Sequence, residues 1–387
     1  MDEDDYLRDL MLAVDVPPTT ADIGLAIATG RRQARRGTIV AGAAAAALVV
    51  AAGTTYALGV APTGGGGRGV QAGPPTDASY ADCTVDQLEV TGPAGIPAVD
   101  PAGRVIVGTV GGTAVRFDNG RTVPYPGATG QVVAVNNAGV IVGYDEVDQA
   151  SHGLAWTYHN GTKTMLAKLA GYDYSFPTAV NARGDVVGAA MGEANDDTVP
   201  VIWPADRPGT VRALAMPAGY GEPNTGGSQA VGLTDDGHVV GNVRGAPTRW
   251  SPDGTPALLP TPPGHEYATV TALRGAIVFG MAAVTGENRV VAIRWDLGLD
   301  QVTVLVGVPY DVTDGTPGGW AITTGGDYNQ PTRVTPQRTV EQLPLPPGVL
   351  LPPNGPGAVA YSISDDGRTI TGATATDGNR RPLIWHC

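Results

Sequence analysis

The stretch Val132–Gly143, VVAVNNAGVIVG, decides the fold. It predicts a short strand, a tight turn over Asn136–Gly139, and a second short strand that ends at Gly143. An asparagine side-chain oxygen can bond the backbone of such a turn, and glycine supplies the positive-φ position that closes it. The β-branched residues on both sides of the turn favour buried strands.

The same pattern returns along the chain. Each copy has a turn glycine, and these are Gly103, Gly139, Gly184, Gly237, Gly275, Gly319 and Gly367. Their mean spacing is about 44 residues, which is typical of four-stranded propeller blades. A second motif follows each turn and ends on a large side chain, at Phe117, Trp156, Trp203, Trp250, Trp295, Val334 and Trp385. We expect this residue to pack between neighbouring blades rather than to bind a ligand.

The last copy is incomplete at its C-terminal end. Fourth strands are predicted near 163–169, 211–214, 257–259 and 302–306, but the chain stops at Cys387 before a seventh one. The segment 84–90, TVDQLEV, closely matches 339–345, TVEQLPL, the fourth strand of the sixth copy. We therefore predict an all-β, seven-bladed propeller in which residues 84–90 complete the last blade and close the ring.

Two cysteines, Cys83 and Cys387, flank the place where the ring closes. Two thiols cannot form a structural zinc site, so they are either free or joined in a disulfide. Cys387 ends the third strand of the last blade and Cys83 begins the fourth. A disulfide between them would replace the turn that joins these strands in the other blades, and we predict that it forms.

The N-terminal residues predict a membrane anchor. Residues 1–36 form a polar tail that ends in four arginines, residues 37–61 carry no charge, and residues 62–79 are a Gly/Pro-rich linker. An uncharged segment of this length can span a bilayer, and the arginines place the tail in the cytoplasm and residues 80–387 outside it. The alternatives are a cleaved signal peptide, a buried Ala-rich helix, or a secretory protein whose start codon is placed too early.

Composition and motifs exclude several function classes. The chain has 387 residues, 42% of them hydrophobic, and a net charge of −13, which disfavours a nucleic-acid partner because phosphate contacts need a basic surface. The sequence has no GxSxG, HExxH, P-loop or EF-hand motif. We therefore predict no catalytic residues, no metal and no cofactor.

Aromatic and acidic residues gather in the connectors between blades. The candidate binding residues are Tyr125, Tyr172, Asp173, Tyr174, Tyr220, Glu222, His265, Glu266, Tyr267, Tyr310 and Asp311. In the predicted blade these connectors lie on the face opposite the turn glycines. Such a surface suits a cation, a basic protein segment or a sugar. The alternative is that the tyrosines only pack the end of the ring.

The repeats resemble a known family at this point. The turn motif followed by residues 151–161, SHGLAWTYHNG, is similar to the extracellular HAF-repeat family of bacterial propeller-like proteins, over about residues 80–387. The family has no settled activity to transfer. The arginine-rich stub and Ala-rich span are also similar in composition to tails of bacterial membrane proteins linked to alternative sigma factors.

Three functions fit these features. The first is a membrane-anchored extracytoplasmic propeller that binds a ligand or protein without catalysis. The second is a glycan-active hydrolase that uses carboxylates such as Asp173, Glu222 and Glu266, which would have to form a pair at a defined separation. The third is a signalling protein whose tail holds a cytosolic regulator.

Overall fold

The computed structural model describes residues 79–387 apart from 119, 148–151, 193–197, 221–226, 288, 325–329, 350–356 and 375–379. The predicted tail, the predicted membrane segment at 37–61 and most of the linker lie outside the described residues. Among the described residues no helix is long and apolar enough to cross a membrane.

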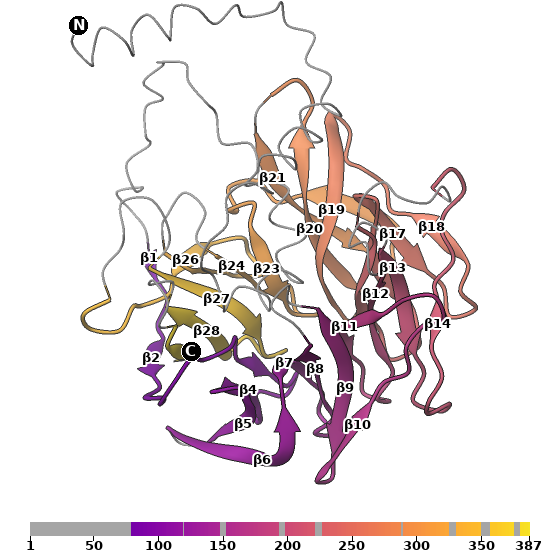
Figure 1. Cartoon of the computed structure of the whole chain (residues 1–387). Coiled ribbons are helices and arrows are strands. Elements are labelled where there is room, and N and C mark those ends of the chain that lie inside the picture. Colours follow the sequence, from indigo (N-terminus) through magenta and orange to yellow (C-terminus); the bar gives the residue numbers. More distant parts are fainter. Residues whose placement is uncertain are drawn as a thin grey trace, which may run out of the picture. The chain divides into compact units, whose positions relative to one another are not determined.

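Seven antiparallel sheets form the seven blades of a β-propeller, which confirms the predicted fold (Figure 1). We number the blades 1–7 in chain order from the first inner strand. The inner strands are β3 (Ala98–Val99), β7 (Gln131–Val135), β11 (Tyr174–Val180), β15 (Gln229–Leu233), β19 (His265–Arg274), β23 (Val312–Gly315) and β27 (Ala358–Ile363). The second strands are β4 (Ile106–Val110), β8 (Ile141–Glu146), β12 (Val186–Met191), β16 (Val239–Val243), β20 (Ile277–Val284), β24 (Ala321–Thr323) and β28 (Thr369–Thr374).

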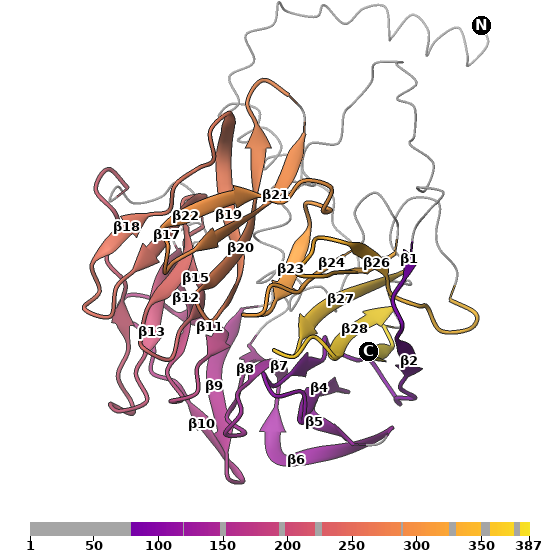
Figure 2. The ribbon, with the colours of Figure 1, turned by 180° about the vertical axis from the view of Figure 1, so that it is seen from behind.

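The third and fourth strands form the outer half of each blade. The third strands are β5 (Thr113–Asp118), β9 (Gly153–His159), β13 (Thr198–Trp203), β17 (Ala246–Trp250), β21 (Val290–Asp296), β25 (Thr332–Val334) and β29 (Pro382–His386). The fourth strands are β6 (Arg121–Thr129), β10 (Thr162–Met165), β14 (Arg212–Ala213), β18 (Pro256–Leu258), β22 (Gln301–Val304), β26 (Val340–Gln342) and β2 (Thr84–Gln87). The views from front and back show the sheets arranged around a common axis (Figure 2).

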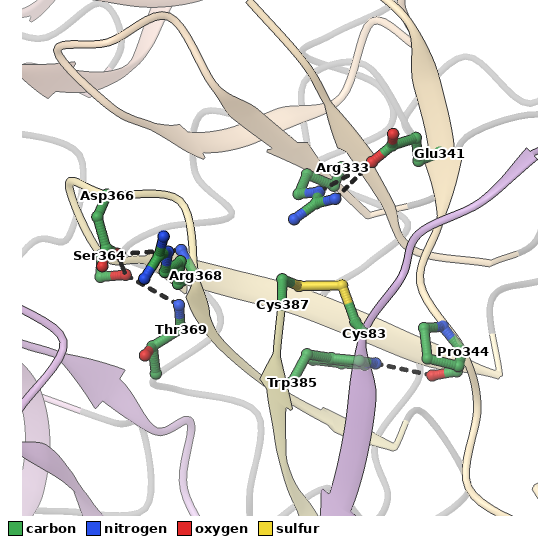
Figure 3. The surroundings of a disulfide bond; sticks show 10 residues. All are labelled: Cys83, Arg333, Glu341, Pro344, Ser364, Asp366, Arg368, Thr369, Trp385 and Cys387. Carbon is green, nitrogen blue, oxygen red and sulfur yellow. Dashed lines mark hydrogen bonds and ion pairs between the residues drawn. A yellow bond between two sulfur atoms is a disulfide. The ribbon is translucent and has the colours of Figure 1, made fainter.

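Blade 7 is assembled from both ends of the described chain, as predicted. Strand β2 pairs antiparallel with β29, with Thr84 opposite His386 and Gln87 opposite Leu383. The Cys83–Cys387 disulfide lies beside this pair, with the two Cα atoms 4.1 Å apart (Figure 3). The two cysteines are 304 positions apart in the sequence, and a disulfide that closes so long a loop restricts the unfolded chain more than one that closes a short loop.

The N-terminal segment also holds blade 6, which the sequence did not indicate. Strand β1 (Ser79–Tyr80) adds in parallel to the outer edge of β26, with Tyr80 opposite Gln342. The backbone amide of Ala81 then donates to the carbonyl of Gln342 at 2.9 Å. Strands β1 and β2 therefore connect the outer edge of blade 6 to the outer edge of blade 7.

The large side chain of the second motif is buried between blades, as predicted. Trp156, Trp250, Trp295 and Trp385 are fully buried, and Trp203, Phe117 and Val334 are nearly so. Four of the indoles donate their Nε1–H to a carbonyl of the preceding blade, for example Trp385 to Pro344 at 2.7 Å (Figure 3). These four tryptophans therefore combine a large buried apolar area with a specific bond to the neighbouring blade, whereas the buried Nε1 of Trp156 has no hydrogen-bond partner among the described residues.

The prediction that the second strand ends at Gly143 was wrong. Strand β8 continues through Gly143 to Glu146, and the glycine lies in the middle of the sheet. A Cβ atom on Gly143 would lie 2.2 Å from the carbonyl oxygen of Gln131 and 2.5 Å from the ring of Trp156. Glycine occurs here because the inner strand and the tryptophan approach the backbone too closely for a side chain.

Candidate functional site

The repeated turn motif builds one end of the ring, which we call the turn face. All seven turn glycines have positive φ, from +57° at Gly275 to +97° at Gly237, as predicted. In blade 2 the side-chain oxygen of Asn136 accepts bonds from the amides of Ala138 at 3.0 Å and Val140 at 2.9 Å. The motif is therefore structural, as the sequence indicated.

The turns also bond to one another, which the sequence did not reveal. The side-chain amide of Asn136 donates to the carbonyl of Asn181 in blade 3 at 2.7 Å, and Asn181 donates in turn to Thr234 of blade 4 at 3.1 Å. At the closing seam the amide of Asp365 donates to the carbonyl of Pro101 at 2.8 Å. Asn136 and Asn181 thus each close their own turn and join neighbouring blades.

A cavity of about 450 Å³ lies on the axis, toward the turn face. Six of the inner strands carry a β-bulge, and the extra residue of each bulge lines the cavity: Val133, Thr178, Val231, Thr271, Thr313 and Tyr361. Pro97 lies at the corresponding place in blade 1. A bulge leaves its extra residue out of the strand pairing, and here that residue is directed to the axis.

The seam between blades 5 and 6 departs from the repeat. Arg274 stands where the other turns have Asp, Asn, Thr or Ser, and Asp314 stands where the other inner strands have Ala, Gly or Ser. The guanidinium donates from Nε to Asp314 Oδ1 at 3.0 Å and from Nη2 to Oδ2 at 2.6 Å. Asp314 Oδ2 also accepts from the amide of Ile363 in blade 7 at 3.2 Å. Both charged residues line the cavity.

Two further titratable groups of the cavity wall have shifted pKa values. Burial raises the pKa of Asp365, Arg274 acts in the opposite direction, and repulsion from other carboxylates, including Asp314 and Asp235, adds to the rise. Burial also raises the pKa of the Tyr361 hydroxyl. The single positive charge of Arg274 therefore does not balance the carboxylates at the cavity.

Four of the predicted tyrosines pack within the propeller. Tyr172, Tyr174 and Tyr220 belong to connectors or the strand end beside one, on the face opposite the turns, which we call the connector face, whereas Tyr125 lies inside a strand and not in a connector. Tyr125 lies in strand β6 with its ring 5.1 Å from that of Tyr158, in an edge-to-face arrangement. Tyr174 is the first residue of β11 and stacks on His152 at 3.9 Å. Tyr172 and Tyr220 pack against the apolar cores of separate seams.

The residues of β19 are the most exposed part of the predicted site. Tyr267 is 75% exposed and has a φ of +51°, which is uncommon for a bulky residue. His265 and Glu266 precede it on the same strand. The Nδ1 atom of His265 lies 2.9 Å from the carbonyl oxygen of Pro263.

The remaining predicted residues are spread over several blades. Asp173 is exposed before β11, and Glu222 lies outside the described residues. Tyr310 and Asp311 precede β23, and Asp311 is buried and bonded by the hydroxyl of Thr324. The described candidates other than Tyr125 therefore lie in connectors or at the strand ends beside them, spread over several blades.

The described residues contain no group of three or more His, Cys, Asp or Glu side chains arranged to hold a metal ion. The axial cavity was not predicted because the repeat pattern alone does not show which residues the bulges direct inward. One signal was present: Arg274 stands where the other copies have a short polar side chain, and Asp314 stands where they have Ala, Gly or Ser.

Comparisons with known proteins identify the fold alone. No family model and no curated protein matches the chain, so the HAF-repeat resemblance stays a prediction. An oligogalacturonate lyase from Vibrio parahaemolyticus is similar in structure, with a TM-score of 0.53 and 9% identity over 80% of this chain and 98% of that one. The protein U3-55K has a TM-score of 0.50 and 12% identity over 80% of this chain and 100% of that one.

A third similar structure is the extracellular domain of a hybrid two-component system protein from B. thetaiotaomicron. It has a TM-score of 0.50 and 10% identity, over 78% of this chain and 39% of that one. Proteins of such different kinds share the propeller, and the fold therefore does not decide the function.

Proposed function

We propose that the chain is a membrane-anchored, extracytoplasmic propeller that binds a ligand in its axial cavity and does not catalyse a reaction. The observation that carries this proposal is the cavity of about 450 Å³ to which all seven blades contribute. Small-molecule sites have volumes of roughly 300–1,000 Å³ and combine apolar walls with a few polar groups. The wall contains valines, threonines and an Arg–Asp ion pair.

A plugged cavity tests the proposal. Val231 is half-buried in the wall, and V231W would fill part of the space. We would screen the purified chain against a panel of small metabolites by thermal shift, and compare V231W with V306W, because Val306 is an exposed residue away from the cavity. We expect V231W alone to lose the ligand-induced rise in melting temperature. The proposal fails if no compound stabilises the wild type or if both variants respond alike.

The disulfide supports an extracytoplasmic location. Structural disulfides persist in oxidising compartments, and Cys83–Cys387 closes the ring. Residues 37–61 supply the proposed anchor, with residues 1–36 in the cytoplasm as a contact for a regulator. Deletion of 37–61 should move the chain from the membrane fraction to the soluble fraction. Recovery of the full chain in the soluble fraction, or with two free thiols, would contradict this part of the proposal.

We favour binding over glycan hydrolysis because the two described carboxylates named for hydrolysis belong to blades that are not neighbours. Asp173 precedes the inner strand of blade 3, and Glu266 lies in that of blade 5. A glycosidase needs two carboxyl groups about 5–9.5 Å apart. Turnover of any member of a glycan panel by the purified chain would reverse this preference.

The connector face is a second candidate binding surface, and Tyr267 favours it. Its side chain is 75% exposed while its backbone holds a strained conformation. Such strain persists mainly where the surroundings or a function require it. Pull-down of sugars or proteins by the wild type but not by Y267A would support this surface, and equal recovery would exclude Tyr267 from it.

A further inference from the structure

The wall of the axial cavity has two unlike sectors. In blades 2–4 the bulge residues are Val133, Thr178 and Val231, and Pro97 takes the corresponding place in blade 1. The residues that directly follow them in the chain are Ala98, Ala134, Ala179 and Gly232. The hydroxyl of Thr178 is bonded to the carbonyl of Ala230 at 2.8 Å. At these inner-strand positions this half of the wall is mainly apolar, and we call it the apolar sector, although its turns also bring Asn136, Asn181 and Asp235 to the cavity.

Blades 5–7 form the second half, which we call the polar sector. Its bulge positions are Thr271, Thr313 and Tyr361, and its next positions are Ala272, Asp314 and Ser362. Arg274 and Asp365 belong to the turns of this sector. An amphipathic ligand that enters the cavity meets carbon on one side and charged, hydroxyl and aromatic groups on the other.

The charges of the wall do not balance. The acidic residues that line the cavity are Asp235, Asp314 and Asp365, and Arg274 is its one basic residue among the described part of the chain. Arg274 is bound by both oxygens of Asp314. Asp235 belongs to the turn of blade 4 and Asp365 to that of blade 7, and repulsion from Asp235 and Asp314 adds to the rise in the pKa of Asp365.

A hydroxyl in the same sector lacks the bond that its counterparts make. Thr178 and Thr313 each donate to an inner-strand carbonyl of the next blade, Thr313 to Ala360 at 2.9 Å. Thr271 occupies the same place in blade 5, and its buried Oγ1 has no hydrogen-bond partner among the described residues. The missing bond is a further point at which this sector departs from the repeat.

We propose that this cavity binds an alkylammonium group, with the alkyl chain along the apolar sector and the cation at the carboxylates of the polar sector. This inference rests on the proposed function and specifies its ligand class. An ammonium has three donors and no acceptor, which suits carboxylates. Tyr361 also lines the cavity, and an aromatic ring can attract a cation. The ammonium can come from a free amine or from a lysine side chain of a polypeptide.

Calorimetric titration of the full chain with n-pentylamine, n-pentanol and pentanoate tests the ligand class. We expect pentylamine to bind at least tenfold more tightly than pentanol, and pentanoate to show no binding. A blocked peptide with one lysine, compared with its norleucine analogue, distinguishes the two sources. Tighter binding of the lysine peptide than of pentylamine assigns the cation to a polypeptide, and the reverse assigns it to a free amine.

A pair of matched variants locates the site. D365N removes a carboxylate of the cavity, whereas D206N removes one from an exposed position on the third-to-fourth-strand turn of blade 3, outside the cavity. We expect D365N to weaken pentylamine binding at least tenfold without lowering the unfolding midpoint, and D206N to leave binding unchanged. Because a cation favours the ionised form of Asp365, wild-type affinity should rise with pH through the raised pKa, and D365N should lose this dependence.

Two results would overturn the proposal. One is binding of pentanol or pentanoate as tightly as pentylamine, and the other is equal amine affinity in D365N and wild type. Absence of amine binding also rejects the ligand class. The broader proposal of an axial binding site has a separate test. It fails if V231W and V306W respond alike to the compounds that stabilise the wild type in the metabolite screen.

Discussion

The seam between blades 2 and 3 and the seam between blades 5 and 6 have corresponding places in the ring but use different chemistry. In the first, a neutral amide of Asn136 reaches the carbonyl of Asn181 at 2.7 Å. In the second, Arg274 and Asp314 form a two-bond ion pair in which Asp314 is almost fully buried. Burial of such a pair carries a desolvation penalty that a neutral contact avoids.

This difference shows that the ring does not need a charged seam. The repeat already provides short polar residues that close the turn and link the blades. Positions that break a local rule without a structural need are expected at functional sites. Both seams line the cavity, but Arg274 and Asp314 bring charge to its wall, whereas Asn136 and Asn181 bring neutral amides.

The largest effect should come from breaking the charged seam. D314A leaves Arg274 without its partner and removes the acceptor of the Ile363 amide, so we expect a loss of about 3 kcal/mol in the free energy of unfolding. The double variant R274N/D314A restores residues typical of the other blades and should regain more than half of that loss. Urea denaturation measures both, and a double variant no more stable than D314A would show that the pair is needed for folding.

The amide seam should be the next most sensitive. N136A removes an acceptor for two turn amides and a donor to Asn181, and we expect a loss of about 2 kcal/mol. N137A serves as its control, because Asn137 is exposed and accepts one bond, from the amide of Ala102 at 2.9 Å. If N137A costs as much as N136A in the same denaturation series, the buried amide is not what joins these blades.

The connector face should respond differently, because Tyr267 is exposed and strained. Replacement by glycine relieves the positive φ, whereas replacement by alanine retains it. We expect Y267G to be more stable than Y267A by about 1 kcal/mol, and both to remain folded. Thermal unfolding of the two variants measures the strain directly. Equal melting temperatures would mean that the backbone at Tyr267 is not strained.

The smallest effect is a pH dependence with opposite signs at two adjacent carboxylates of the turn face. Asp365 has a pKa raised above its ordinary 3.8, mainly by burial, so folding favours its protonated form. Stability should fall as pH rises from about 3.8 through the raised pKa, and D365N should not show this fall.

The neighbouring Asp366 has a lowered pKa. Burial opposes this shift, but bonds from the Ser364 hydroxyl and the Arg368 amide together with the Arg368 charge outweigh it. Its contribution to stability should be present above 3.8 and lost as pH falls through the lowered pKa, and D366N should remove it. The free energy of unfolding of both variants, measured between pH 2.5 and 7 at intervals of about half a pH unit, checks the two signs. Curves of the same sign would contradict the assignment.

Much of the architecture could be predicted because each blade repeats a local code. The turn glycines gave the blade count, and the match of 84–90 to 339–345 gave the closing strand and the disulfide pair. The inter-blade tryptophans followed from their position in the repeat. The role of Gly143 was misread because only the approach of the Gln131 carbonyl explains a glycine within a strand.

The candidate site was less predictable, because side-chain type does not tell which contacts a residue makes. Tyr125 and Tyr174 look in the sequence like binding residues, yet their rings pack on Tyr158 and His152. The parallel addition of β1 to β26 was also absent from the predictions, since two residues carry no periodic pattern.

The sequence by itself determined the number of blades, the closing strand and the disulfide, because these follow from local turn chemistry repeated at a regular interval. Only the tertiary structure decided where the inner residues point. A bulge in each of six inner strands directs one side chain to the axis, and seven blades must surround that axis before a cavity exists. Arg274 and Asp314 lie 40 residues apart, and their pairing depends on two blades meeting at one seam.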